Sequence, residues 1–304
     1  MHLKPSNIWV APLLSLAIAS TLTACGGGDS SSSGTGTGSL SLSITDAPVD
    51  DADNVFIEFT GVEIKPSGGN SFSINFAQPQ QIDLLSLTGG TAEILLDGET
   101  LAAGNYEWLR LKVNATTGGD PADDSYIVIN GVSHELRIPS GNQTGLKLNR
   151  PITIPEDGAT SFTIDFDLRK SIHETGNGTY QLRPTLRLID NTTDGALSGT
   201  VDTGTIAAEC IAGDTGAVYV FEDAGTTPDD VNVDGNDIEP VATAIVDWEN
   251  SDYDYTVAFL EAGSYTAAFT CDAGSDDPAA EDTLIFVGTT DVTINAGHTT
   301  FLDF

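Results

Sequence analysis

The stretch SLSLSITDAP, residues 39–48, alternates apolar with small polar residues: Leu40, Leu42 and Ile44 fall at every second position. Side chains with this period lie on one face of an extended chain, so the pattern predicts a half-buried β-strand. The next apolar stretch, NVFIEFTGVEIKP (54–66), keeps the alternation but changes its parity around Gly61. A parity change at a glycine predicts a bulge or bend within a strand.

Short strand-like stretches of this kind recur along the chain, separated by Gly, Pro, Asn and Asp. LLSLTGGTAEILLD (84–97) is the best candidate for a turn or short helix. Residues 195–304 contain about eight further strand candidates, and helical periodicity is nearly absent throughout. The chain is therefore predicted to be all-β, with two antiparallel β-sandwich domains in tandem behind a disordered N-terminal tether.

A short pattern appears once in each predicted sandwich. LAAGNYEWLRL (101–111) and LEAGSYTAAF (260–269) both place Leu-x-Ala-Gly-x-Tyr before a strand. The glycine would supply the turn, and the tyrosine is predicted to anchor the start of the strand.

Residues 39–194 resemble a known family. The blocks ITDAPVDDADNVFIEFTGVEI, DLLSL, LAAGNYEWLRLKV, GLKLNRPITI, TIDFDLRKSI and YQLRPTLRLI are similar to bacterial and archaeal lipoproteins of the domain-of-unknown-function family 4382. The resemblance implies an exported, usually lipid-anchored β-sandwich and supplies no activity or catalytic residue. In residues 195–304, the LEAGSYTAAF pattern occurs with an opening SGTVD (198–202) and a closing AGHTTFLDF (296–304). Together these resemble the prealbumin-like modules of carboxypeptidase-regulatory and cell-surface proteins, which implies a seven-to-eight-stranded sandwich without catalysis.

The N-terminus predicts export. Residues 1–24 have the short apolar run of a signal peptide, too short to span a bilayer. Leu22-Thr23-Ala24-Cys25 resembles the lipobox of bacterial lipoproteins, in which the cysteine carries the lipid. The resemblance makes Cys25 the membrane anchor, and Gly26 after it implies the outer membrane of a Gram-negative cell, facing the periplasm or the surface. Residues 25–38 would be the lipidated cysteine and a flexible Gly/Ser linker. The alternative is ordinary cleavage after Ala24.

The remaining two cysteines are expected to pair. If Cys25 is lipidated, Cys210 and Cys271 are left in an exported segment, where an oxidising environment favours a disulfide between them. Two buried free thiols are the alternative.

The chain is strongly acidic, with a formal net charge of −34. Residues 195–304 contain 22 Asp plus Glu and no Lys or Arg. Such a surface repels nucleic acid and attracts cations. It fits either adaptation to salty surroundings or the binding of divalent cations.

One loop has part of a calcium-binding pattern. Asp230-x-Asn232-x-Asp234-Gly235 matches the first half of a calcium loop, with oxygen ligands at positions 1, 3 and 5 and the turn glycine at 6. Position 12 is Val241 instead of a glutamate, although Glu239 or the Glu222–Asp223 pair could substitute. We weigh a Ca²⁺ site at Asp230, Asn232 and Asp234 against a plain acidic surface turn.

Charged residues in one predicted strand allow two interpretations. Asp165, Asp167 and Arg169 would share one face of SFTIDFDLRKSI (161–172), opposite Ile164, Phe166 and Leu168. We expect these charges to pair with bases on neighbouring strands, such as Arg183 and Arg187. A ligand site using Asp165, Asp167 and Arg183 is the alternative.

No catalytic motif is present in the sequence. His134, His173 and His298 lack partners at metal-ligand spacing, and neither a nucleophile elbow nor a phosphate loop occurs. The sequence favours a non-catalytic, lipid-anchored cell-envelope protein that binds an unknown protein or glycan ligand. An accessory envelope subunit that docks a partner protein is the alternative, and a hydrolase with an unrecognised site is a remote one.

Overall fold

The computed structural model describes residues 36–47, 52–116, 118–139, 146–176, 178–211, 216–232, 238–247 and 253–304. The signal peptide, Cys25 and most of the predicted tether lie outside these ranges. Residues 35–304 form one compact unit whose regular secondary structure is mostly β-strand, so the all-β prediction is confirmed. Within the described residues, no helix is both long and apolar enough to cross a membrane.

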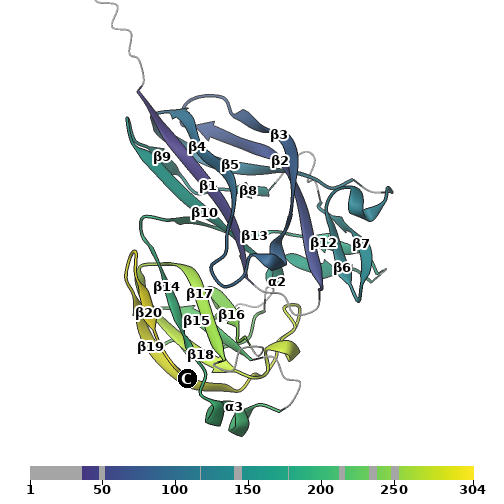
Figure 1. Cartoon of the computed structure of the whole chain (residues 1–304), viewed down its shortest axis with the longest axis vertical. Coiled ribbons are helices and arrows are strands. Elements are labelled where there is room, and N and C mark those ends of the chain that lie inside the picture. The colour runs from purple at the N-terminus through teal and green to yellow at the C-terminus, as the bar shows by residue number, and fades with distance from the viewer. Residues whose placement is uncertain are drawn as a thin grey trace, which may run out of the picture. The chain divides into compact units, whose positions relative to one another are not determined.

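Four strands form the first sheet, in the order β13-β10-β1-β4 (Figure 1). Their bounds are β1 Thr37–Ala47, β4 Glu93–Ala102, β10 Ala159–Asp167 and β13 Thr185–Asp190. The predicted alternation in β1 is confirmed, because Leu40, Leu42 and Ile44 are each fully buried. β1 begins at Thr37, two residues before the predicted boundary, and it pairs with β10 in parallel rather than antiparallel.

Nine strands form the second sheet, whose apolar side chains share one core cluster with those of the first. Its strands are β2 Asn54–Pro66, β3 Phe72–Asp83, β5 Gly104–Asn114, β6 Tyr126–Ile129, β7 Val132–Arg137, β8 Leu146–Leu148, β9 Ile152–Ile154, β11 Ile172–Glu174 and β12 Tyr180–Leu182. The register of β2 shifts between Phe59 and Gly61 against both neighbours, which confirms the predicted bulge. A Cβ on Gly61 would lie 2.4 Å from the Ile74 carbonyl oxygen, so only glycine fits there.

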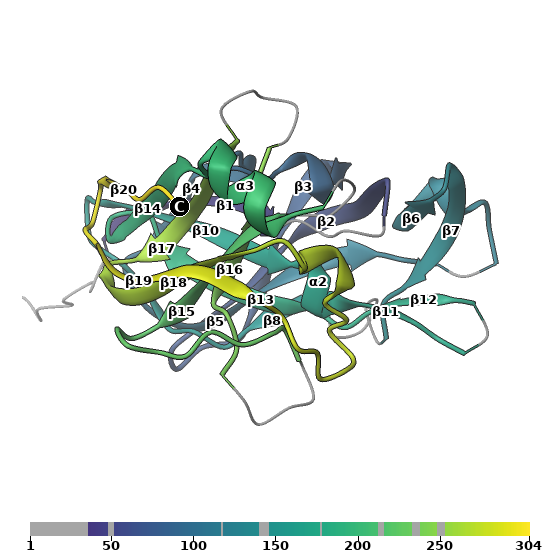
Figure 2. The same ribbon diagram turned by 90° about the horizontal axis from the view of Figure 1, so that it is seen from below.

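Short helical turns connect these strands. They are η1 Leu84–Ser86, η2 Pro121–Asp123 and α2 Leu168–Ser171. The predicted turn or helix over 84–97 is therefore right only at its start, since Glu93–Asp97 belongs to β4. α2 lies beside β13 (Figure 2).

Two smaller sheets follow in the chain. One has the order β17-β14-β20 and the other β16-β15-β18-β19. Their strands are β14 Asp194–Thr200, β15 Ala217–Glu222, β16 Ala242–Ile245, β17 Asp254–Glu261, β18 Gly263–Thr270, β19 Phe286–Ile294 and β20 Thr299–Phe301. Residues 286–294 form one continuous strand, β19, which joins parts of two of the strand candidates in this segment, TLIFVG (283–288) and DVTINA (291–296). Among the described strands, those before Asp194 and those from Asp194 onward pair within their own groups; the two-domain division stays a prediction.

β15 is buried on both faces. Val218 and Val220 join the core shared with the β17-β14-β20 sheet, whereas Tyr219 and Phe221 belong to a second cluster on the opposite face. The Tyr219 and Phe221 rings pack against Phe286, with centroids 5.5 and 6.2 Å away. Loop segments that cover this opposite face must therefore supply partners for any polar group they bury.

A disulfide joins Cys210, just after α3 (Thr203–Glu209), to Cys271, just after β18. Their Cα atoms are 5.3 Å apart and they are 61 residues apart in the sequence. The predicted pairing is confirmed. The bridge fixes α3 to the start of the segment that contains η3 Ala273–Ser275.

The repeated Leu-x-Ala-Gly-x-Tyr pattern has the same geometry in both places. The Tyr106 hydroxyl donates to the Ala102 carbonyl and the Tyr265 hydroxyl donates to the Glu261 carbonyl, each at 2.8 Å. Both tyrosines are buried, and burial raises the pKa of each phenol. Each hydroxyl thus ties the start of one strand to the end of the strand before it, which confirms the predicted anchor.

Removing either hydroxyl should destabilise the fold modestly. We expect Tyr106→Phe and Tyr265→Phe each to lower the free energy of unfolding by about 1 kcal/mol, because each leaves a carbonyl without its donor. Equilibrium urea unfolding measures the change. Tyr126→Phe is the control, since the Tyr126 ring stacks on Phe56 at 4.7 Å and its contact does not need the hydroxyl. Equal losses in all three variants would contradict the anchor.

Candidate functional site: an acidic cluster beside a buried arginine

The outer face of β15 is covered by two loop segments that carry acidic residues. One contains Asp229, Asp230 and Asn232 and leads away from β15; the other runs from Cys271 to Glu281 and leads into β19. Val231 and Ala273 from these segments are buried in the cluster that contains Tyr219. Their apolar residues hold the loops against the sheet, and the neighbouring acids are held with them.

Asp230 is the most buried acid of the first segment, with 2% of its surface exposed. Its Oδ2 accepts a hydrogen bond from the Asp282 backbone N–H at 2.5 Å. Its Oδ1 is buried and has no hydrogen-bond partner among the described residues. Buried carboxylates in proteins are normally paired or bound to a metal, so this oxygen marks an unusual site.

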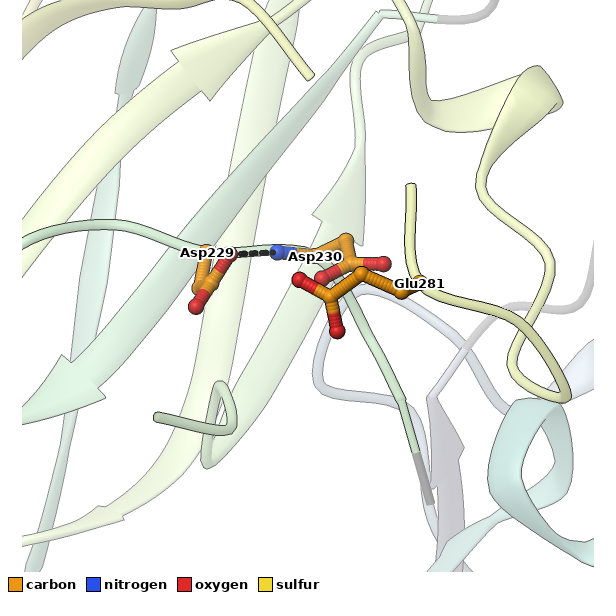
Figure 3. Close-up of side chains that lie close together, drawn as sticks. All are labelled: Asp229, Asp230 and Glu281. Atoms are coloured by element: carbon orange, nitrogen blue, oxygen red, sulfur yellow. Dashed lines mark hydrogen bonds between the residues drawn. The ribbon is translucent and has the colours of Figure 1, made fainter. Parts of the chain in front are cut away.

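Two further carboxylates lie against Asp230. Carboxylate oxygens of Asp229, Asp230 and Glu281 lie within 4.8 Å of one another. In Figure 3 the Glu281 carboxylate lies next to that of Asp230, and Asp229 accepts a hydrogen bond from the Asp230 backbone N–H. Asn232 holds Glu281 in place by donating from Nδ2 to Oε2 at 3.0 Å. Glu281 is exposed and Asp229 half-buried, so the group opens to solvent on one side.

A second group, Asp230, Asp276 and Asp282, shares Asp230 with the first. Asp276, however, is already engaged by a base. Arg169 lies 3.3 Å from its Oδ2, and the Tyr219 hydroxyl donates to the same oxygen at 2.5 Å. The Val231 backbone N–H donates to Oδ1 at 3.2 Å. Burial raises the pKa of the Asp276 carboxyl, and the Arg169 guanidinium opposes that rise.

Arg169 is itself buried, with 7% of its surface exposed. Its NH1 donates to the Tyr219 hydroxyl at 2.6 Å, and its NH2 donates to the carbonyls of Ala273 and Asp276 at 2.5 and 3.1 Å. One guanidinium thus binds a carboxylate, a phenol and two main-chain oxygens. The fork of donors on arginine suits such a site better than a lysine ammonium would.

Lys170 makes a second, less buried contact with the C-terminal segment. Its Nζ donates to the Pro240 carbonyl at 2.8 Å and lies 3.4 Å from Glu239. Burial raises the pKa of Glu239, and the Lys170 ammonium partly offsets this. Glu239 in turn accepts from the Asn232 backbone N–H at 3.0 Å. Because residues 195–304 contain no Lys or Arg, α2 supplies cations that this segment lacks.

The family model described as "Domain of unknown function (DUF4382)" matches residues 37–184. These residues, just under half of the chain, are similar to that family. The resemblance expected from the sequence is therefore confirmed for this segment, and it brings no known activity. No curated protein matches the chain.

Several solved structures show distant similarity. The Bacillus anthracis TIE protein is 14% identical, with 88% of this chain and 33% of that chain covered and a TM-score of 0.20; the chain thus spans about one third of that protein. The minor pilin GBS52 of Streptococcus agalactiae is 12% identical, with 87% and 94% covered and a TM-score of 0.21. The major pilin subunit BcpA of Bacillus cereus is 11% identical, with 88% and 98% covered and a TM-score of 0.20. Scores this low carry no argument about arrangement or function.

Arg169 belongs to the segment that matches the family model, and its position differs from the one that the sequence pattern predicted. Arg169 was expected on the solvated face of a strand with Asp165 and Asp167. β10 instead ends at Asp167, and Arg169 lies in α2, buried against Tyr219. Asp167 begins this turn because its Oδ1 accepts from the Lys170 backbone N–H at 3.0 Å. The strand prediction for 161–172 was wrong over Leu168–Ser171, because this local cap ends β10 and begins a helical turn, whereas Ile172 begins β11.

The pairing of Asp165 with Arg187 is confirmed. The two residues are directly opposite in the β10–β13 register, and the Arg187 side chain donates twice to Asp165 Oδ2, at 2.9 and 2.5 Å. Both line a cavity of about 400 Å³. Arg183 is not on β13 as expected; it precedes that strand, and its backbone N–H donates to the Ser171 carbonyl. The alternative ligand site at Asp165, Asp167 and Arg183 therefore has its two acids already engaged, by Arg187 and Lys170.

Of the residues predicted to bind calcium, Asp230 and Asn232 lie in the acidic cluster. Asp234 falls outside the described residues, as does Cys25. The sequence pattern missed Glu281 and Asp282, which come from a loop about 50 positions further on. The one available signal was the acidic stretch DDPAAED (276–282), and acidic stretches are too common in this chain to select it.

Proposed function

We propose that the chain is an exported, lipid-anchored, non-catalytic binding module of the cell envelope, held at the outer membrane through Cys25. The observation that carries this proposal is the disulfide between Cys210 and Cys271. Disulfides persist in oxidising compartments, which supports export. With these two cysteines paired, Cys25 is the remaining cysteine of the three, and it ends the lipobox-like Leu22–Cys25.

Side chains with catalytic potential are engaged in structural contacts, which supports binding over catalysis. The His134 ring packs edge-on against Tyr180, with centroids 5.2 Å apart. His298 Nδ1 lies 2.7 Å from the Ala296 carbonyl oxygen. Asp165 and Asp276 each form an ion pair with an arginine, Arg187 and Arg169 respectively. The ligand we propose is an envelope protein or glycan.

Lipid attachment is tested by metabolic labelling with radioactive palmitate. We expect the full chain to be labelled and to fractionate with membranes, and Cys25→Ser to lose both properties because its hydroxyl is not a substrate for lipid transfer. The control is the double variant Cys210→Ala/Cys271→Ala, which keeps Cys25 and should keep the label. Label that persists in Cys25→Ser would overturn the anchor.

Ligand binding is tested on arrays of purified envelope proteins and glycans. A saturable signal from the full chain is expected, with no product released from ester or glycoside substrates. Turnover of any such substrate at a rate proportional to protein concentration would instead favour the hydrolase.

A further inference from the structure

The acidic cluster on the outer face of β15 contains a carboxylate whose environment is incomplete. Asp230 is almost fully buried, and its Oδ1 lacks a hydrogen-bond donor among the described residues. The Glu281 carboxylate lies within 4.8 Å of it, so a second negative charge faces the first. A buried anion beside another anion is strongly unfavourable unless positive charge lies between them.

The bases near the cluster do not supply that charge. Arg169 pairs with Asp276 and Lys170 pairs with Glu239. Within the described ranges, no basic side chain pairs with Asp230 or Glu281, and residues 195–304 contain no Lys or Arg. Among the described residues, the chain therefore supplies no positive charge that pairs with Asp230 or Glu281.

The donor set selects the kind of cation. The available atoms are carboxylate oxygens of Asp229, Asp230 and Glu281, without histidine or thiolate among them. Such donors suit Ca²⁺, Mg²⁺ or Mn²⁺ rather than zinc or copper. Oxygens on one Ca²⁺ lie about 2.4 Å from the ion and so up to about 4.8 Å from one another, which matches the spread here. Carboxylates from two separate loops suit the flexible coordination of Ca²⁺ better than the strict octahedron of Mg²⁺.

We propose that Asp229, Asp230 and Glu281 bind a calcium ion, with water completing its coordination through the side that opens to solvent. The ion joins the loop after β15 to the loop before β19, and Asn232 positions Glu281 for it. The alternative group through Asp276 is disfavoured because Arg169 and Tyr219 already occupy that carboxylate. This inference stands apart from the proposed function, since it does not depend on Cys25 or on any envelope ligand.

Isothermal titration calorimetry of the full chain in detergent, with CaCl₂ at near-physiological NaCl, tests the site. One saturable site is expected, with a Kd on the order of 10⁻⁴ M, as in other extracellular calcium modules. Asp230→Asn and Glu281→Gln should each weaken binding by about tenfold or more, because each removes a ligand charge. Glu281 is exposed, so Glu281→Gln keeps the test valid if Asp230→Asn fails to fold. MgCl₂ should bind more weakly than CaCl₂.

The matched control is Glu209→Gln, which removes the same charge from an exposed position at the end of α3. It should bind calcium as the unmodified chain does. Three results would overturn the proposal: no saturable heat at 10-fold excess over the expected Kd, equal weakening in Glu209→Gln and Glu281→Gln, or tighter binding of magnesium. Equal weakening of calcium binding in the two variants would indicate diffuse attraction of calcium to the acidic surface and not a specific site.

Discussion

Arg169→Met is expected to lower the free energy of unfolding by about 3–5 kcal/mol, the loss typical when one partner of a buried ion pair is removed. The Arg169 and Asp276 side chains are 6% and 0% exposed, so water cannot replace the lost guanidinium. Methionine retains much of the side-chain volume but leaves Asp276 buried without its cation. The carbonyls of Ala273 and Asp276 lose their donors as well.

Chemical unfolding followed by fluorescence measures this loss, and a thermal scan should show a fall in Tm on the order of 10 °C. Arg150→Met is the control. Arg150 also contacts the C-terminal segment, at 2.6 Å from Glu261, but both side chains are about half exposed. Exposed pairs contribute about 0–1 kcal/mol. Similar losses in the two variants would show that burial of Arg169 is not what makes its contact strong.

The pH dependence of the Arg169→Met variant provides a second readout. Burial raises the pKa of Asp276, and removing the cation that opposes this should raise it further. The folded variant then holds a proton that the unfolded chain, with a carboxyl pKa of about 3.9, releases. Its stability relative to the unmodified chain therefore rises as pH falls through the folded pKa and is lost again as pH increases. A deficit that stays constant as the pH is lowered from 7 toward the pKa of the unfolded carboxyl would contradict this origin.

Local features of the fold could be predicted from the sequence because they depend on neighbours along the chain. The alternation of Leu40, Leu42 and Ile44 predicted a buried face, and the parity change at Gly61 predicted the bulge. The repeated pattern around Tyr106 and Tyr265 predicted two anchors of the same kind. Each of these needs only the geometry of one strand and the turn before it.

The acidic cluster and the Arg169 contact depend on residues far apart in the sequence. Arg169 meets a carbonyl 104 positions away at Ala273, and Asp230 meets the backbone of Asp282, 52 positions away. In a segment with 22 acidic residues, no local pattern distinguishes Glu281 from the others. Glu281 lies in the cluster because its loop packs against the outer face of β15. That packing depends on tertiary structure and not on a local sequence pattern.

Cys210→Ala/Cys271→Ala is the second change with a large expected effect. In the chain-entropy model, a bridge between residues 61 apart stabilises by about 4 kcal/mol, because the unbridged unfolded chain has more conformations. We expect the double variant to lose about that free energy of unfolding. The unmodified chain under reducing conditions should behave in the same way, which separates loss of the bridge from any effect of the alanines.

The disulfide and Arg169 should not act independently. Cys271 lies two residues before Ala273, and the bridge holds the turn that presents the carbonyls of Ala273 and Asp276 to the guanidinium. Without the bridge this turn is freer in the folded state, so the contact of Arg169 contributes less. Arg169→Met combined with the cysteine double variant is therefore expected to cost less than the sum of the two changes, by about 0.5–3 kcal/mol, as for residues in one network. Additive losses in a double-mutant cycle would mean that the bridge acts only on the unfolded chain and that Arg169 finds its partners without it.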